Sequence, residues 1–289
     1  MVKFILAARR KPEDTQERYF YEWSIIHVAL MITNPTTTRT FRRYAQHYTI
    51  NGIANELLWH PLSPMAWDNM ADHWLEKLSD MEASVRNPDY VQRMQPHKFG
   101  DSEFVVELTG GATRYEAPDF RNGGVKLIHF LKKRPELSQE AFVDRWERQH
   151  VPAVIDALAP LGILRKYVQS PRLLIDPATF QGTLFEKGGV GQYAGIEEFW
   201  FSGLDDLTRL RNDSKAWERI RASDESLTGG SDSFSMVTTE RVVFDFATPG
   251  LQTPQPAVLT PGTLEALIDA QGYSGFNVPR PPGASPGSR

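Results

Sequence analysis

The feature that most constrains this chain is a duplication of its first half in its second. When the sequence is shifted by 123 positions, residues 2–32 align with residues 125–155 without a gap, and 11 of the 31 aligned positions are identical. The same shift aligns residues 42–46 with 165–169, and a shift of 126 aligns residues 72–74 with 198–200. Agreement in three separate blocks indicates two copies of one unit of roughly 115 residues, joined head to tail.

Each copy has the pattern β-α-β-β-α-β, which predicts an α+β fold. A strand-like run at 2–9 or 125–132 precedes a helix with Thr15 or Ser138 as its N-cap. Strands are predicted around Tyr44 and Tyr167, at 70–75 and 196–201, and at 103–108 and 235–245, with a second helix at 78–95 and 204–222. The predicted domains are residues 1–117 and 118–247, with a linker at 112–124 and a proline- and glycine-rich tail at 248–289.

Composition excludes several classes of function. The formal net charge of −4 and the pI of about 6.0 argue against a nucleic-acid partner. The chain has no cysteine, so disulfides and thiolate nucleophiles are excluded. No apolar stretch is long enough to span a membrane. We therefore expect a soluble, cytoplasmic protein with no membrane partner.

The repeated pattern resembles that of EthD-domain proteins. It consists of a Val-Lys-x-Ile strand, a Lys/Arg-Pro pair, a helix with Trp-x-x-x-His and a third strand that ends in Trp, and both copies have it. The second copy is more similar, because it also has the His-x-Pro ending at His150 and Pro152. The resemblance implies tandem ferredoxin-like units whose two sheets pair into a pseudo-dimeric α/β barrel. Whether two such chains pair again as a homodimer stays open.

The EthD group is similar to a wider set of dimeric α/β barrels that includes isomerases, polyketide cyclases, decarboxylases, dehydratases and cofactor-free monooxygenases. The resemblance implies a pocket between the sheet and the helices, with proton transfer by His, Tyr and acidic residues. The match to methylmuconolactone methylisomerases includes the helix histidine and a strand-two tyrosine. Their strand-three cysteine is absent, and His73 or Phe199 occupies its approximate place.

The candidate catalytic residues follow from helix and strand periodicity. His27 and His150 lie four residues after a tryptophan, so each shares a helix face that a buried indole must turn toward the sheet. Strand alternation places His73 with His27 in the first copy, and His129 and Glu197 with His150 in the second. Tyr44 and Tyr167 are candidates to donate a hydrogen bond to an enolate oxygen. Structural roles in the core are the alternative for each of these residues. Asp72 and Glu198 are interpreted as solvated strand charges.

The long segments before the third strands are candidate lids. The first contains Trp59 and His60, and the second is rich in glycine but lacks the Lys-Ser/Thr of a phosphate loop. No pair of histidines has a tight metal-ligand spacing. The sequence therefore predicts neither a cofactor nor a metal.

These features favour a cofactor-independent lyase or isomerase that acts on a small apolar, aromatic or polyketide-like compound. Decarboxylation, dehydration and cyclisation are the reactions considered, and the second copy is favoured for the chemistry because His129, His150 and Glu197 can converge there. The alternatives are a cofactor-free monooxygenase and a non-catalytic EthD-type accessory protein of a degradative pathway.

Overall fold

The computed structural model describes residues 1–95, 99–230 and 232–246, and the predicted tail at 248–289 lies outside them. The first half begins with β1, the helical segment α1, η1 and α2, and the short helix α3. The two remaining helices, α4 and α5, lie between β3 and β4. The bounds are β1 (Val2–Arg10), α1 (Gln16–Tyr21), the π-helix η1 (Glu22–His27), α2 (Val28–Ile32), α3 (Pro35–Thr40), β2 (Phe41–Thr49), η2 (Asn55–Leu57), β3 (Asn69–Leu75), α4 (Leu78–Arg86), α5 (Pro88–Met94) and β4 (Gly100–Thr109).

The second half repeats this order after one additional strand. Its bounds are β5 (Ala112–Glu116), β6 (Val125–Leu131), α6 (Gln139–Arg145), the π-helix η3 (Trp146–His150), α7 (Val151–Leu158), β7 (Lys166–Pro171), η4 (Pro177–Phe180), η5 (Glu186–Gly188), β8 (Gly195–Phe201), α8 (Asp205–Asn212), α9 (Ser214–Thr228) and β9 (Phe234–Asp245). The first part of the predicted linker is therefore wrong, because β5 is a strand that pairs with β7.

Helix starts follow the predicted caps, but the second helix of each half is interrupted. The Thr15 and Ser138 side chains accept hydrogen bonds from the backbone N–H groups of Arg18 and Ala141, as expected for N-caps. A single helix at 78–95 is wrong because Pro88 lacks the N–H that would continue α4, and a new helix begins there. In the second half, Asp213 caps α9 and separates it from α8. Among the described helices, none combines the length and the apolar character that a membrane crossing requires.

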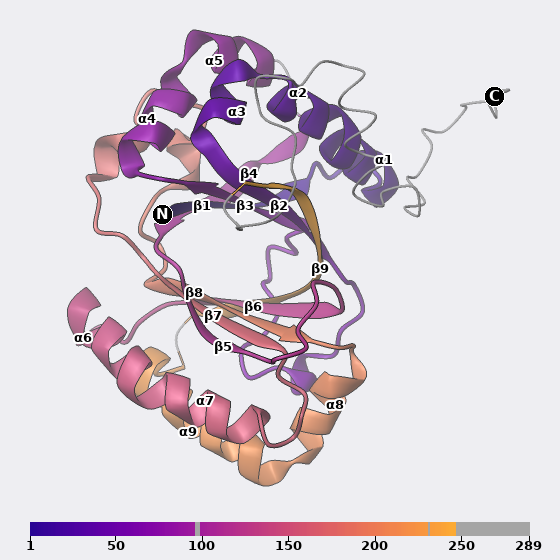
Figure 1. Ribbon diagram of the computed structural model, residues 1–289, viewed down its shortest axis with the longest axis vertical. Helices are drawn as coiled ribbons and strands as arrows, with labels where there is room; N and C mark the ends of the chain where they lie inside the picture. The colour runs from indigo at the N-terminus through magenta and orange to yellow at the C-terminus, as the bar shows by residue number, and fades with distance from the viewer. Residues whose placement is uncertain (96–98, 231, 247–289) are drawn as a thin grey trace, which may run out of the picture.

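The nine strands in the described part of the chain form one antiparallel sheet in the order β4-β1-β3-β2-β9-β6-β8-β7-β5. Strands β2 and β9 join the two halves along a register from Arg43 opposite Asp245 to Thr49 opposite Thr238. On the opposite side, an isolated bridge between Thr109 and Arg172 links the end of β4 to the end of β7. Figure 1 shows the result, in which the sheet curves around an interior with α1–α5 outside one side and α6–α9 outside the other.

The interior of this curved sheet contains a network of charged side chains. Strand alternation turns Lys3 and Lys126 inward, and both lysines are 1% exposed. The interpretation of Asp72 and Glu198 as solvated charges is wrong, because both are equally buried. The network comprises Lys3, Arg43, His47, Asp72, Lys126, Glu198, Glu240 and Asp245.

Lys126 is at the centre of this network. Its Nζ lies 2.5 Å from Glu198 Oε2, 2.8 Å from Glu240 Oε2 and 4.1 Å from the centroid of the Trp200 ring. Lys3 makes the equivalent contacts with Asp72 and Trp74 and also pairs with Glu198 from the other half. The repeated lysine and tryptophan of the two copies are therefore explained as a pair of cation–π contacts inside the sheet.

Replacing Lys126 with methionine should destabilise the protein strongly. The free energy of unfolding should fall by about 3–5 kcal/mol, because Glu198 and Glu240 lose a shared buried counter-charge. The measurement is urea denaturation, and the control is Arg148→Met, which removes an exposed partner of Asp144 and should change stability little. Equal urea midpoints for the two variants would contradict a structural role for the network.

Candidate active site

The long loop of each half packs on the other half. Leu58 and Trp59, from the loop before β3, belong to the hydrophobic core of the second half. Phe180, from the loop before β8, belongs to the core of the first half, with Leu184 and Phe185 packed beside it. Each loop therefore covers the space between the sheet and the helices, as expected of a lid, but it does so in the opposite half. We call both of them crossing loops.

A cavity of about 500 Å³ lies between the sheet and the helices of the first half. Its wall is mostly apolar and aromatic, and the loop before β8 contributes Phe185 to it. Polar side chains also line the cavity, among them the exposed Gln95 and Lys187. This volume lies within the range that accommodates a small organic ligand. The main apolar contributors are Phe4, Trp23, Met31, Phe41, Phe104 and Phe185.

His73 is the most distinctive polar group in the cavity wall. Its Nδ1 donates a hydrogen bond to the Phe4 carbonyl oxygen over 3.3 Å, so the lone pair is on Nε2. Nε2 is buried and has no hydrogen-bond partner. The ring stacks on Tyr44 with a centroid distance of 4.6 Å and an interplanar angle of 18°. Burial lowers the pKa of His73 to about 4, so the imidazole is neutral near pH 7.

His27, Tyr19 and Asn69 are further polar groups in the wall. His27 is the last residue of the π-helix η1, and its ring lies 5.2 Å from that of Phe99. Such helical irregularities are frequent at functional sites. The Tyr19 hydroxyl is buried beside Asn69, and burial raises its pKa well above the ordinary value. Tyr19 was not among the candidate residues, because its place beside the cavity depends on tertiary packing.

Tyr44 does not line this cavity. Its ring lies behind His73, and its hydroxyl oxygen accepts a hydrogen bond from Gln46 Nε2 over 3.0 Å. Gln46 also donates to the Trp23 carbonyl oxygen, so the tyrosine is part of a buried network below the helix. The structure thus gives Tyr44 a supporting position, and the tyrosines that line the cavity are Tyr19 and Tyr90.

In the second half, the predicted residues converge on Glu197. His129 Nδ1 donates to Glu197 Oε1 over 2.8 Å, and the Tyr167 hydroxyl donates to Oε2 over 2.9 Å. Trp146 Nε1 also donates to Oε2, over 3.2 Å, and His150 Nε2 lies 3.4 Å from the same oxygen. All five side chains are fully buried.

The charges of this group are strongly coupled. Burial by itself would raise the pKa of Glu197, but His150 and His129 lower it well below the usual range. Burial would lower the pKa of His150, but the Glu197 carboxylate raises it. For His129 burial prevails and lowers the pKa to about 4. The arrangement is an ion pair between Glu197 and His150, with a neutral His129 hydrogen-bonded to the same carboxylate.

At equivalent positions on the sheet faces that contact the helices, one half therefore has a polar residue where the other has an apolar one. The first half keeps a cavity with one strand histidine, and the second half fills the same region with a hydrogen-bonded cluster. His60, from the loop before β3, lies beside this cluster. Together, His60, His129 and Glu197 are close enough to hold a metal ion. The exchanged pairs are Leu6 and His129, Ala71 and Glu197, and His73 and Phe199.

Comparisons with known proteins agree with this architecture. Residues 134–228 match the EthD domain family. A solved structure of an anthrone oxidase-like protein superimposes with a TM-score of 0.52 at 11% sequence identity, covering 86% of this chain and 96% of its own. A mutant chlorite dismutase from Candidatus Nitrospira defluvii gives a TM-score of 0.43 at 13% identity, with 93% and 95% covered. No curated protein matches the sequence. The match to the EthD domain family thus lies in the second half of the chain, and the likeness to the anthrone oxidase-like protein is a likeness of fold.

Proposed function

We propose that the chain is an enzyme that removes a proton from a small aromatic or polyketide-like compound bound in the first-half cavity. The observation that carries this proposal is His73 Nε2, a buried nitrogen with a free lone pair in the wall of an apolar cavity of about 500 Å³. A neutral imidazole in this position is a general base that needs no cofactor. His73 was predicted as a candidate, but the sequence favoured the second half.

The surroundings of His73 suit proton abstraction next to a carbonyl group. The hydrogen bond from Nδ1 to the Phe4 carbonyl oxygen fixes the tautomer and leaves Nε2 as the proton acceptor. Burial opposes the imidazolium form in the free protein, but the enolate that forms on the substrate supplies a negative counter-charge beside the ring. Tyr19 and His27 line the same cavity and are the groups we assign to the enolate oxygen.

The fate of the enolate decides the reaction class. Protonation at another carbon gives an isomer, and expulsion of a β-hydroxyl group, which takes up the proton and leaves as water, makes the enzyme a lyase. Reaction of the carbanion with molecular oxygen gives a cofactor-free monooxygenase. The anthrone oxidase-like neighbour supports this second candidate by its name, while its sequence identity of 11% supports only the fold. All of these reactions begin with the same proton transfer.

We further propose that the chain consists of two tandem ferredoxin-like domains, residues 1–117 and 118–247. The support is the strand order, in which the last, first, third and second strands are neighbours in both halves. In this arrangement the first domain provides the base, and the second provides the loop that covers it. The second domain's own cluster around Glu197 then has a separate role.

Replacing His73 with glutamine should abolish turnover but not binding. We expect kcat/KM to fall about 10²–10⁴-fold, the usual contribution of a general base, with the substrate dissociation constant nearly unchanged. The measurements are solvent deuterium incorporation and oxygen consumption for a panel of anthrones and cyclic ketones. Deuterium incorporation without oxygen uptake indicates a lyase or isomerase, and uptake indicates a monooxygenase.

The matched control is Met94→Leu, which keeps the volume of a cavity residue and removes no proton-transfer group. It should retain turnover. Full activity of His73→Gln, or binding of the compounds by the wild type with neither exchange nor oxygen uptake, would reject the catalytic proposal and leave an accessory binding role.

The pH dependence should identify the base. A base accepts a proton only in its neutral form, and the pKa of His73 is lowered to about 4 by burial. The value of kcat/KM should therefore be constant from neutral pH down to about pH 5 and fall as the pH decreases through about 4. An acidic limb centred near the ordinary histidine value of 6.5 would assign the base to a different group.

A further inference from the structure

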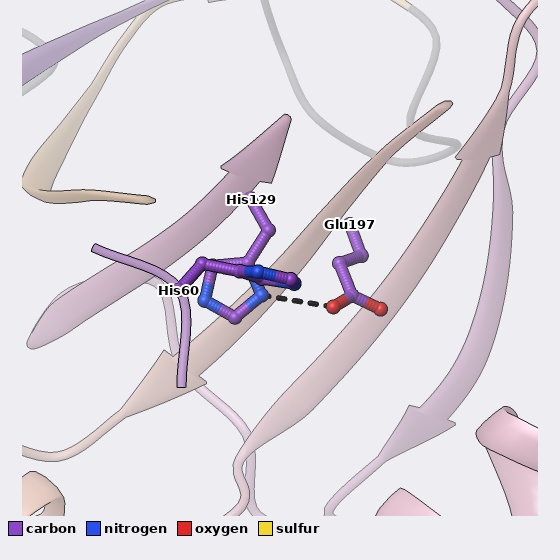
Figure 2. Close-up of side chains that lie close together, drawn as sticks. All are labelled: His60, His129 and Glu197. Atoms are coloured by element: carbon purple, nitrogen blue, oxygen red, sulfur yellow. Dashed lines mark hydrogen bonds and ion pairs between the residues drawn. The ribbon is translucent and has the colours of Figure 1, made fainter. Parts of the chain in front are cut away.

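We propose that His60, His129 and Glu197 bind one divalent transition-metal cation, of the class of Zn²⁺ or Co²⁺. The three side chains come from three segments of both halves: the loop before β3, strand β6 and strand β8. Figure 2 shows them directed toward one another, with the His60 ring beside that of His129. The ring centroids lie 4.9 Å apart and the rings are nearly perpendicular, at 83°.

The donor atoms have the composition and spacing of a metal site. Each residue offers one ligand atom, and these atoms lie within 4.8 Å of one another. Two imidazoles and one carboxylate are a common ligand set for Zn²⁺ and related cations. With metal–ligand bonds of about 2.0–2.2 Å, ligand atoms are roughly 3–4 Å apart, so a bound cation requires only small movements of these side chains.

The hydrogen bonds of the two histidines define the tautomers that a bound cation needs. His60 Nε2 donates to Asp224 Oδ1 over 3.0 Å, so its Nδ1 has a lone pair that can bind a cation. His129 Nδ1 and Glu197 Oε1 lie 2.8 Å apart and share a proton in the free protein. A cation between these two atoms would replace that proton, and it requires the other tautomer of His129, with the proton on Nε2.

Outer groups support the proposed ligands. Asp224 orients His60 in the way that a carboxylate orients a metal-bound histidine. Tyr167 and Trp146 donate to Glu197 Oε2 and so fix the rotation of the carboxylate. Glu197 is fully buried and Asp224 is 6% exposed, so two carboxylates lie beside the proposed cation, and Glu197 also pairs with His150.

The site is absent from the corresponding positions of the first half. Leu6 stands where the second half has His129, and Ala71 stands where it has Glu197. Trp59, the neighbour of His60, packs edge-on against His129 with a centroid distance of 4.4 Å. The cation would therefore hold the crossing loop of the first half against the sheet of the second half. This role is independent of proton transfer by His73.

The test uses the full chain without a histidine tag, stripped of metal with a chelator and dialysed. We expect Zn²⁺ titration calorimetry to give one bound ion per chain, and Co²⁺ to give the visible spectrum of a site with nitrogen and oxygen ligands. Zn²⁺ should also raise the Tm. His129→Leu, which introduces the first-half residue, should weaken binding at least 100-fold and remove the Tm increase.

The matched control is His73→Phe, which introduces the second-half residue at a histidine outside the site and should keep one ion per chain. Circular dichroism checks the fold of each variant. His60→Gln, in a loop rather than a strand, tests the same site if His129→Leu fails to fold. The proposal is overturned if the wild type binds no ion, or if the folded ligand variants bind as the wild type does.

Discussion

The charged interior of the sheet is the constraint on which the rest of the structure depends. Lys3 pairs with Asp72 of its own half and with Glu198 of the other, so the two halves share buried counter-charges. Buried charges are tolerated only when they are paired and hydrogen-bonded. Because side chains alternate along a strand, fixing Lys3 and Lys126 inside also fixes which residues face the helices. Among those residues are His73 and His129, so the interior charges determine where these two candidate site residues lie.

Much of this arrangement could be predicted from the sequence because it follows from local periodicity. The duplication predicted the β-α-β-β-α-β succession of elements along each half, apart from α3 and β5. Strand alternation grouped His129 with Glu197, and His73 with the helix that contains His27. The N-caps at Thr15 and Ser138 were predictable for the same local reason. These features require only the neighbours of each residue along the chain.

Features that depend on distant partners could not be predicted. Glu198 looked like a solvated charge because its partner Lys3 is 195 residues away. The packing of each long loop on the opposite half could not be predicted either, because it joins segments that are far apart in the sequence. The same holds for the position of His60 beside His129 and Glu197. A search for metal ligands at short sequence spacing cannot find three ligands that come from three segments. The space between the sheet and the helices of the second half is filled in part by Trp59, which comes from the first half.

The exchange of loops makes each half incomplete without the other. The wall of the first-half cavity includes Phe185 of the second half, and the core of the second half includes Leu58 and Trp59 of the first. The two copies differ: one has a cavity with a strand histidine, and the other has a polar cluster in the corresponding place. Because each long loop packs on the opposite half, a change in the packing of either copy alters the surroundings of the other. The structural unit is therefore the joined pair of copies.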